Sequence, residues 1–226
     1  MISHKYKCIF IHIPKCAGSS IETALGHLDR HTGREGQDHR SIRIIKQPLF
    51  TPSAFSSIDN IYELLSSLRY NTKKFSNYRN NFTVTRKQFN TYYKFTFVRN
   101  PWARAFSWYR NVMRDKNHQK ALKINDEISF KDFLRKYAGK GYLKPQTYWL
   151  KNYNGSIALD YIGQFENLAD DFENVCKALD IRNISLPHKL KAPKIDYCQY
   201  YDADSDEIIR QVYSEEIEMF KYSFEC

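Results

Sequence analysis

Hydrophobic positions along the chain follow two different patterns. Short, mostly apolar runs rich in β-branched and aromatic residues, at about 7–13, 94–98 and 161–165, indicate buried strands. Between and after these runs, apolar residues recur every three or four positions, as in amphipathic helices. Strands that alternate with helices predict an α/β protein with a central parallel sheet. The helices are expected at about 20–28, 57–68, 101–114, 129–137 (capped by Ser129), 168–179 and 204–219.

The turn after the first predicted strand has the composition of an anion-binding loop. Residues 14–20, PKCAGSS, bring together a lysine, a glycine and two hydroxyls. Ser19 and Glu22 match the S-x-x-E capping box, so Ser19 is expected to be the N-cap of the next helix. Backbone N–H groups and the Lys15 ammonium would then face one point, which suits a phosphate or sulfate. The alternative is an ordinary strand–turn–helix crossover with a surface lysine.

The predicted strand at 94–98 ends in a similar way. Arg99 follows it, Asn100 is a good N-cap, and Pro101 suits the first helical position. Ligands of open α/β sheets bind at the carboxyl ends of the strands. Two such strand ends, each with a cation, predict a ligand with two anionic groups. The polar face of the helix predicted at 101–114 is expected to carry Arg104, Ser107, Asn111 and Arg114.

Both segments resemble motifs of sulfotransferases. Residues 13–20 are similar to the 5′-phosphosulfate loop of that family, and residues 97–109 are similar to its 3′-phosphate motif. The resemblance is to the carbohydrate sulfotransferase branch, including small bacterial members. It implies a three-layer α/β/α fold related to P-loop NTPases, as a single domain over 1–226. It is weakest over about 47–93, which we interpret as a basic and aromatic insertion.

The resemblance implies a donor, a product and a set of donor-binding residues. The donor is 3′-phosphoadenosine-5′-phosphosulfate, the product is adenosine 3′,5′-bisphosphate, and no metal is expected. Lys15 matches the catalytic lysine that stabilises the bridging oxygen, and Arg99 matches the arginine that holds the 3′-phosphate. The expected donor-binding residues are Lys15, Cys16, Ala17, Gly18, Ser19, Ser20, Arg99, Ser107 and Lys191.

The general base is expected to be a histidine with a pKa near neutrality. His39 is preferred, because resembling enzymes place a histidine before a short apolar run like the one after Arg40, which we interpret as a strand. His188 is the alternative, although we interpret it as a positional residue. His12 lies within the first predicted strand and is interpreted as a core histidine.

The acceptor is expected to be a hydroxyl of a carbohydrate, either a cell-envelope glycan or a glycolipid. Gln146 matches a family segment that lines the acceptor cleft, and it is assigned to acceptor contact. Glu166 follows a strand end and is assigned to acceptor binding or to orienting the base, with a structural carboxylate at a helix N-terminus as the alternative.

Composition narrows the choice of partner and compartment. The net charge is +10, and residues 69–94 hold seven basic and seven aromatic residues with no acidic one. This segment suits a polyanionic glycan or a nucleic acid, and a solvated surface insertion is the simplest interpretation. Five cysteines without a C-x-x-C pair predict neither a metal site nor a disulfide framework. We expect a bacterial cytoplasmic enzyme without a transmembrane segment.

Two other functions compete with sulfuryl transfer. A P-loop kinase-like phosphotransferase would share the fold, but the pattern G-x-x-x-x-G-K-[ST] is absent, since Gly18 follows Lys15. An RNA-binding protein would explain the basic segment but not the two strand-end motifs, and no nucleic-acid partner is expected. The oligomeric state does not follow from the sequence.

Overall fold

A computed structural model describes residues 1–226 except 30, 32–35, 47–50, 126, 188–195 and 225–226. The chain divides into two compact units, Met1–Val98 with Tyr148–Leu190 and Arg99–Thr147 with Lys191–Cys226. Each unit has its own hydrophobic core. The single domain predicted over 1–226 stays a prediction.

The first unit is built on a four-stranded sheet in the order β1-β2-β3-β4. β1 (Ile2–Ser3) runs antiparallel to β2 (Cys8–Ile11), whereas β3 (Tyr93–Val98) runs parallel to both β2 and β4 (Tyr161–Gln164). Every residue of β2 is buried, as is all of β3 after its first residue. Such continuous burial is typical of parallel strands that are covered on both faces. The predicted α/β fold with a mostly parallel sheet is confirmed.

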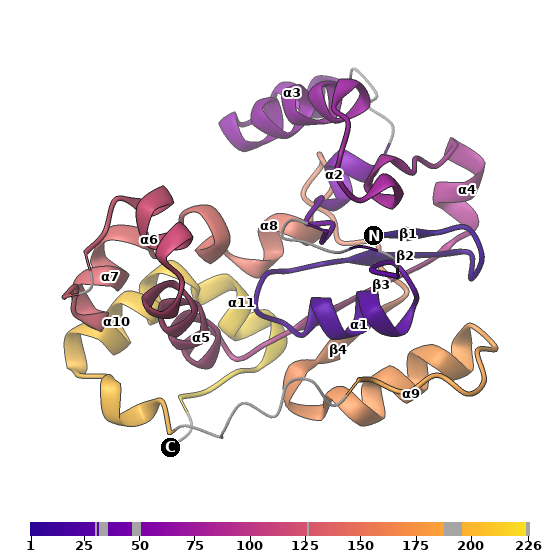
Figure 1. Ribbon diagram of the computed structural model, residues 1–226. Coiled ribbons are helices and arrows are strands. Elements are labelled where there is room, and N and C mark those ends of the chain that lie inside the picture. The colour runs from indigo at the N-terminus through magenta and orange to yellow at the C-terminus, as the bar shows by residue number, and fades with distance from the viewer. Residues whose placement is uncertain (30, 32–35, 47–50, 126, 188–195, 225–226) are drawn as a thin grey trace. The chain divides into compact units, whose positions relative to one another are not determined.

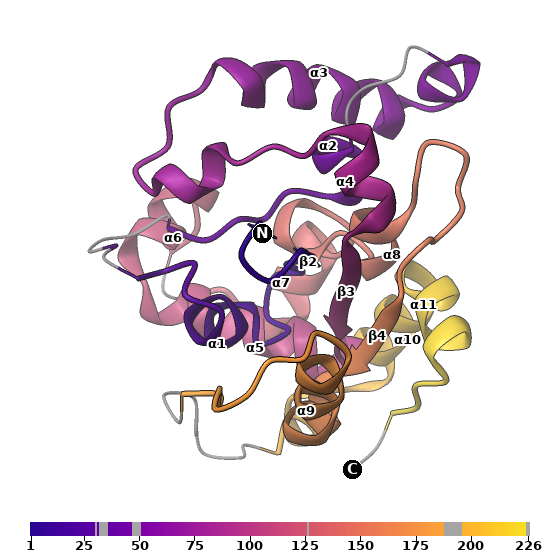
Figure 2. The ribbon, with the colours of Figure 1, turned by 90° about the vertical axis from the view of Figure 1, so that its right-hand side faces the viewer.

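Helices cover both faces of this sheet (Figures 1 and 2). α1 (Gly18–Ala24) and α9 (Leu168–Ala178) lie on one side, where they share a core with Phe10, Phe95 and Phe97 of the strands. The elements between residues 42 and 91 lie on the other side or at its edge. They are α2 (Ile42–Ile45), η1 (Pro52–Phe55), α3 (Ile58–Thr72), η2 (Tyr78–Asn81) and α4 (Arg86–Thr91).

The second unit is helical where it is described (Figure 1). Trp102, Phe106, Phe133 and Tyr213 are among its buried core residues. α8 (Gln146–Leu150) begins in this unit and ends in the first. No helix in the described part of the chain combines the length and the apolar character that a membrane span requires. The remaining elements are α5 (Pro101–Arg114), α6 (Lys116–Leu122), α7 (Phe130–Tyr137), η3 (Gly141–Leu143), η6 (Cys198–Tyr200), α10 (Ala203–Val212) and α11 (Ser214–Phe220), with η4 (Phe165–Asn167) in the first unit.

The predicted helix caps have different outcomes. Asn100 caps α5 by accepting hydrogen bonds from the Trp102 and Ala103 N–H groups, and Ser129 caps α7, so these predictions are confirmed. Ser19 is not the cap of α1, because that helix begins two residues earlier than predicted, at Gly18, with Ala17 at the N-cap position. The Glu22 side chain does not reach back to Ser19, since it is fully buried beneath the loop.

Other local predictions are wrong for reasons of tertiary packing. The strand expected after Arg40 is the helix α2, whose first turn is capped by the Ser41 hydroxyl. The closing helix is divided at Tyr213, whose buried hydroxyl donates to the Leu143 carbonyl at 2.7 Å. Arg104 was expected on a polar face, but it is buried and its guanidinium donates to the carbonyls of Tyr142 and Lys144.

The cysteines also depart from one expectation. Cys198 is disulfide-bonded, whereas Cys8, Cys16 and Cys176 are free and buried. The cysteine pattern did not point to a disulfide at Cys198. Nothing in the spacing of the five cysteines pairs this residue with another, so the bond depends on tertiary structure.

Candidate active site

The loop between β2 and α1 has an unusual backbone. Lys15 has φ 71° and Ala17 has φ 62°, so two non-glycine residues within three positions adopt the left-handed region. Such residues cost roughly 1–3 kcal/mol each and are found mainly where the surrounding structure fixes them. When left-handed residues alternate with right-handed ones, successive backbone N–H groups point toward one side and form a concave surface that suits an anion. The loop itself, rather than the seven-residue helix after it, therefore has the backbone geometry of an anion site.

Gly18 is required by a contact beneath the loop. A Cβ atom at this position would lie 1.9 Å from Cδ2 and 2.0 Å from Nε2 of His12. Real Cβ atoms do not approach other heavy atoms so closely, so a larger residue would displace the imidazole. His12 is buried as predicted, with 2% of its surface exposed. Its ring thus fills the space that the glycine leaves open.

His12 belongs to a buried polar cluster that the sequence did not reveal. Its Nδ1 lies 3.0 Å from Oε1 of Glu22, and the same oxygen accepts a hydrogen bond from the Asp38 N–H at 3.1 Å. Burial lowers the pKa of His12 to about 3 and raises the pKa of Glu22. Burial opposes ionisation of Asp38 as well, but the Arg40 guanidinium outweighs it and holds the Asp38 pKa well below its usual range.

His39 lies against this cluster. Its ring centroid is 4.2 Å from that of His12, and its Nδ1 is 3.4 Å from the His12 carbonyl oxygen. Its Nε2 is 3.3 Å from Oε1 of Gln37, and the Gln37 amide donates to the Ser19 hydroxyl at 2.5 Å. The structure therefore connects His39 to the Lys15 loop through Gln37, a residue that the sequence analysis did not single out.

The protonation of the His39 ring depends on its burial and on its two polar contacts. Burial, followed by the neighbouring His12, lowers the pKa of His39 to about 3, so the expectation of a pKa near neutrality is wrong. A neutral imidazole donates from one nitrogen only, and the His12 carbonyl can only accept. Gln37 Oε1 is also an acceptor, so each ring nitrogen faces an oxygen and the contacts alone do not assign the tautomer. Nε2 holds the lone pair if the Gln37 amide is rotated by 180°, and the Ser19 hydroxyl then donates to Gln37 instead of accepting from it.

In the second unit, Arg99 is held by a buried glutamine. The Gln146 side chain accepts from the Arg99 N–H and donates to the Arg99 carbonyl, both at 2.8 Å. Gln146 is fully buried, and its Nε2 also donates to Oε1 of Glu216 at 2.9 Å. The Gln146 N–H donates to Oε2 of the same carboxylate. These contacts fix the backbone at Arg99 immediately before Asn100 caps α5.

The comparison with known proteins decides the family. The profile of the Sulfotransferase family matches residues 1–223. The chain belongs to the sulfotransferase family. It is also 36% identical over 112 residues to an uncharacterized protein of Archaeoglobus fulgidus, a match that covers 47% of this chain and 79% of that protein. No solved structure matches the chain. Sulfuryl transfer is the chemistry that this family membership supports.

The other residues expected in the sulfotransferase site are dispersed. Cys16 is buried, and its thiol donates to the Pro14 carbonyl over 3.7 Å. Ser20 is buried in α1, and Glu166 is exposed in η4. Lys191 and His188 lie outside the described residues. Among described residues, no group of three or more histidine, cysteine or acidic side chains could hold a metal ion.

The two residues of the second unit that were predicted to hold the 3′-phosphate are both partly buried. Arg99 directly precedes the cap of α5, and Ser107 lies about two turns into that helix. Gln146 was assigned to acceptor contact, which stays a prediction. The contacts in the structure give it a different task, since its amide holds the backbone of Arg99. Glu216, which completes this arrangement, was not identified from the sequence.

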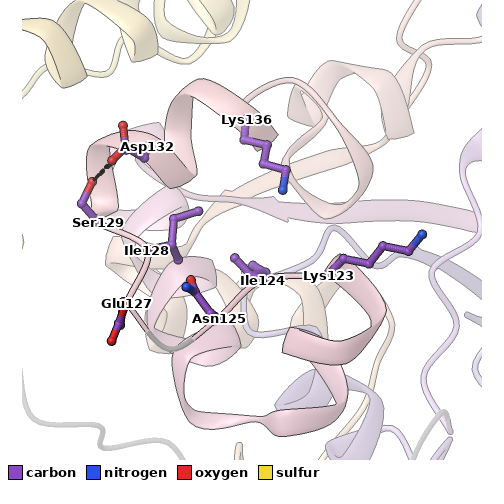
Figure 3. Close-up of a pocket in the computed structure, with 8 residues that line it drawn as sticks. All are labelled: Lys123, Ile124, Asn125, Glu127, Ile128, Ser129, Asp132 and Lys136. Carbon is purple, nitrogen blue, oxygen red and sulfur yellow. Dashed lines mark hydrogen bonds between the residues drawn. The ribbon is translucent and has the colours of Figure 1, made fainter.

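Two cavities lie outside the residues predicted for donor binding. One, of about 600 Å³, lies between α6 and α7 in the second unit, with Lys123 and Lys136 on one side and Asp132 on the other (Figure 3). The second, of about 470 Å³, lies in the first unit at the end of α3. Its lining includes Tyr70, Lys73 and Lys74 of the basic and aromatic segment.

Proposed function

We propose that this sulfotransferase moves a sulfuryl group from 3′-phosphoadenosine-5′-phosphosulfate to a hydroxyl of a carbohydrate acceptor. The proposal combines the family membership of residues 1–223 with the geometry of the Lys15 loop. One observation carries it. Gln37 and Ser19 connect the loop, which suits the transferred group, to the imidazole of His39.

The proposed reaction needs a base, a cation and alignment. Nε2 of His39 accepts the proton of the acceptor hydroxyl as the acceptor oxygen bonds to sulfur. The bond between sulfur and the bridging oxygen of the donor breaks, and adenosine 3′,5′-bisphosphate leaves. Negative charge grows on the bridging oxygen, where the Lys15 ammonium stabilises it. As in phosphoryl transfer, positioning and charge neutralisation supply most of the rate enhancement.

Donor binding is assigned to the loop and to the strand end at Arg99. The backbone of residues 15–18 and the hydroxyls of Ser19 and Ser20 would hold the 5′-phosphosulfate. Arg99 and Ser107 would hold the 3′-phosphate, because a guanidinium fork matches the geometry of phosphate oxygens. The brace that Gln146 provides to the Arg99 backbone supports this assignment, since a fixed backbone limits the positions that its side chain can take.

Acceptor binding is assigned to the basic and aromatic segment 69–94. Tyr70 stacks on Phe75 at 4.8 Å, and Lys73 and Lys74 line the cavity of about 470 Å³. Aromatic faces suit sugar rings and cations suit acidic groups, so an anionic glycan fits this lining. Arg40, next to the proposed base, lines the same cavity. We therefore propose that the acceptor approaches His39 from this side.

Calorimetry and sulfate transfer test the proposal. The chain should bind adenosine 3′,5′-bisphosphate without added metal and more tightly than ATP. A labelled sulfuryl group should pass from the donor to envelope glycans, and Lys15→Ala should slow the transfer by roughly 10²–10³ while the fold remains intact. Equal affinity for ATP, or a requirement for Mg²⁺, would favour a kinase-like phosphotransferase instead.

A further inference from the structure

Helix α3 turns mostly polar residues toward the protein and apolar residues toward the surface, the reverse of an ordinary surface helix. Apart from Leu64, its buried positions are polar (Asn60, Glu63 and Ser67), whereas a surface helix normally buries its apolar stripe. Its outward positions form an apolar stripe with the spacing of one helix face. The stripe consists of Ile58 (87% exposed), Ile61 (39%), Tyr62 (59%), Leu65 (55%) and Leu68 (42%).

Specific hydrogen bonds hold the polar face of α3 inward. Asn60 accepts from the Arg43 guanidinium at 2.7 Å and donates to the Tyr153 carbonyl at 2.8 Å. The Glu63 carboxylate accepts from the hydroxyls of Ser41 and Tyr148. Rotation of α3 to bury its stripe would break all of these bonds and leave buried polar groups unpaired, which is strongly unfavourable. The outward direction of the stripe is therefore built into the fold.

The stripe occupies a convex position. α3 is the outermost element of its side of the sheet in both views of the ribbon (Figures 1 and 2). Ile58 and Leu68 are ten residues apart, so the stripe extends roughly 15 Å along the helix. A single convex helix offers no groove for a peptide, but it matches a flat surface into which its side chains can sink.

Basic residues continue from the stripe. Arg69, Lys73 and Lys74 are exposed at the end of α3 and directly after it. No acidic residue occurs between residues 69 and 94. Asp59, at the opposite end of the helix, is the one exposed acidic residue of α3. An apolar stripe that ends in a basic cluster has the pattern of helices that lie in the interface of anionic membranes.

We propose that the stripe of α3 and its basic cluster dock the protein onto an anionic lipid bilayer. The stripe would enter the boundary between headgroups and acyl chains, and the three basic residues would contact acidic headgroups. Charge argues against a second copy as the occupant, because each copy carries +10. The proposal concerns a surface, so it does not depend on the proposed reaction.

Vesicle co-sedimentation tests the proposal directly. The full chain is mixed with vesicles of phosphatidylcholine alone or with phosphatidylglycerol added. Ile58→Gln with Leu65→Gln removes apolar area at exposed positions while keeping helix propensity, and should weaken binding at least tenfold. Replacing Arg69, Lys73 and Lys74 with Gln should weaken it roughly a hundredfold, since each basic residue contributes about fivefold.

Matched controls separate the stripe from general hydrophobicity and charge. Met219→Gln removes an exposed apolar side chain outside the stripe. The charge control replaces three exposed lysines of the second unit with Gln and so removes three positive charges, as the basic variant does; they are Lys120, Lys136 and Lys140. Both controls should keep most of the binding. Binding to anionic vesicles that both test variants lose and both controls keep would support the proposal.

Other outcomes would overturn it. If the parent protein ignores anionic vesicles, the surface is not a membrane surface. If only the basic variant loses binding, the contact is electrostatic and the stripe has no part in it. A lower melting temperature in the stripe variant, or a dimer in sedimentation velocity that this variant abolishes, would show that the stripe packs against protein.

Discussion

Replacing Gly18 with alanine tests the arrangement beneath the loop most sharply. The new Cβ would lie about 2 Å from two atoms of the His12 ring, so the ring must move. The ring cannot move freely, because it bonds to the buried Glu22 and packs against the His39 ring, which is tilted by 50° with its centroid 4.2 Å away. The substitution should therefore destabilise the first unit, although alanine favours a helix more than glycine does.

The expected loss of stability follows from three contributions. Overpacking of a buried site costs roughly 1–3 kcal/mol. Loss of the hydrogen bond between His12 and Glu22 leaves buried polar atoms unpaired, at roughly another 1–3 kcal/mol. The better helix propensity of alanine returns up to about 1 kcal/mol. The net loss is about 1–6 kcal/mol, and each kcal/mol should lower the melting temperature by about 2–4 °C in a chain of this size.

A double-mutant cycle isolates the contact. Unfolding in urea, followed by circular dichroism, is measured for Gly18→Ala, His12→Ala and the double variant. The double variant should lose less than the sum of the single losses, by about 1–3 kcal/mol, because removal of the ring makes room for the Cβ. Gly155→Ala is the control: Gly155 has φ 81° and nothing within 4 Å of its Cβ position, so only backbone strain of about 1 kcal/mol is expected.

The same variants separate two roles of Gly18. If the glycine serves only the contact with His12, the double variant should recover affinity for adenosine 3′,5′-bisphosphate along with stability. If the glycine also lets the backbone approach the phosphate, affinity should stay low in the stable double variant. A Gly18→Ala variant as stable as its parent, or strictly additive losses in the cycle, would refute the reasoning about His12.

The remaining predictions concern chemistry and binding. Lys15→Ala should lower turnover by roughly 10²–10³ with little change in bisphosphate affinity, whereas Arg99→Ala should chiefly weaken that affinity. Initial rates measure the first effect and calorimetry the second, and the reverse pattern would contradict these roles. His39→Ala should remove about 10²–10⁴ of the rate, and the parent rate should show no loss from His39 protonation between pH 8 and 5, since its pKa is about 3. Between pH 6.5 and 3, His39 binds a proton in the unfolded chain but not in the folded chain. As the pH is lowered through this range, His39 should therefore lower the unfolding free energy of the chain by up to about 1.4 kcal/mol per pH unit. The unfolding free energy of His39→Ala should decrease less steeply over the same range. Gln146→Ala should weaken bisphosphate binding without a change in acceptor KM. A change in acceptor KM alone would support the predicted contact between Gln146 and the acceptor instead. Neutralising the lysines of 69–94 should raise acceptor KM and flatten its salt dependence, and an unchanged KM would make the segment a solvated insertion.

Much of the fold follows from local sequence because its elements are locally consistent. The strands at 94–98 and 161–165 are apolar runs, and the caps Asn100 and Ser129 precede regular helical patterns. Where the predictions fail, a distant partner decides the outcome. The closing helix divides at Tyr213, whose hydroxyl bonds to Leu143, 70 residues earlier in the chain. No local signal contains that partner.

The candidate site shows the same limit. The PKCAGSS run and His39 are recognisable in the sequence, because a loop motif and a histidine before an apolar run are local features. The tasks of Gln37 and Gln146 are not, since each depends on hydrogen bonds to residues 18 and 47 positions away. A glutamine carries no chemistry of its own that would mark it. Only its partners reveal that it positions another residue.

The burial of Glu22 explains why the loop departs from a capping box. A carboxylate in the first turn of α1 would stabilise the helix, but it would also repel an anionic donor at the loop. Burial instead raises the pKa of Glu22, lowers the pKa values of His12 and His39, and so favours the neutral form of all three groups. The ionised Asp38 lies 2.6 Å from the Arg40 guanidinium and 3.2 Å from the N-terminal ammonium. With Asp38 paired twice, the groups beneath the loop include no uncompensated carboxylate when Glu22 is neutral, which favours the anion binding that we propose for the loop.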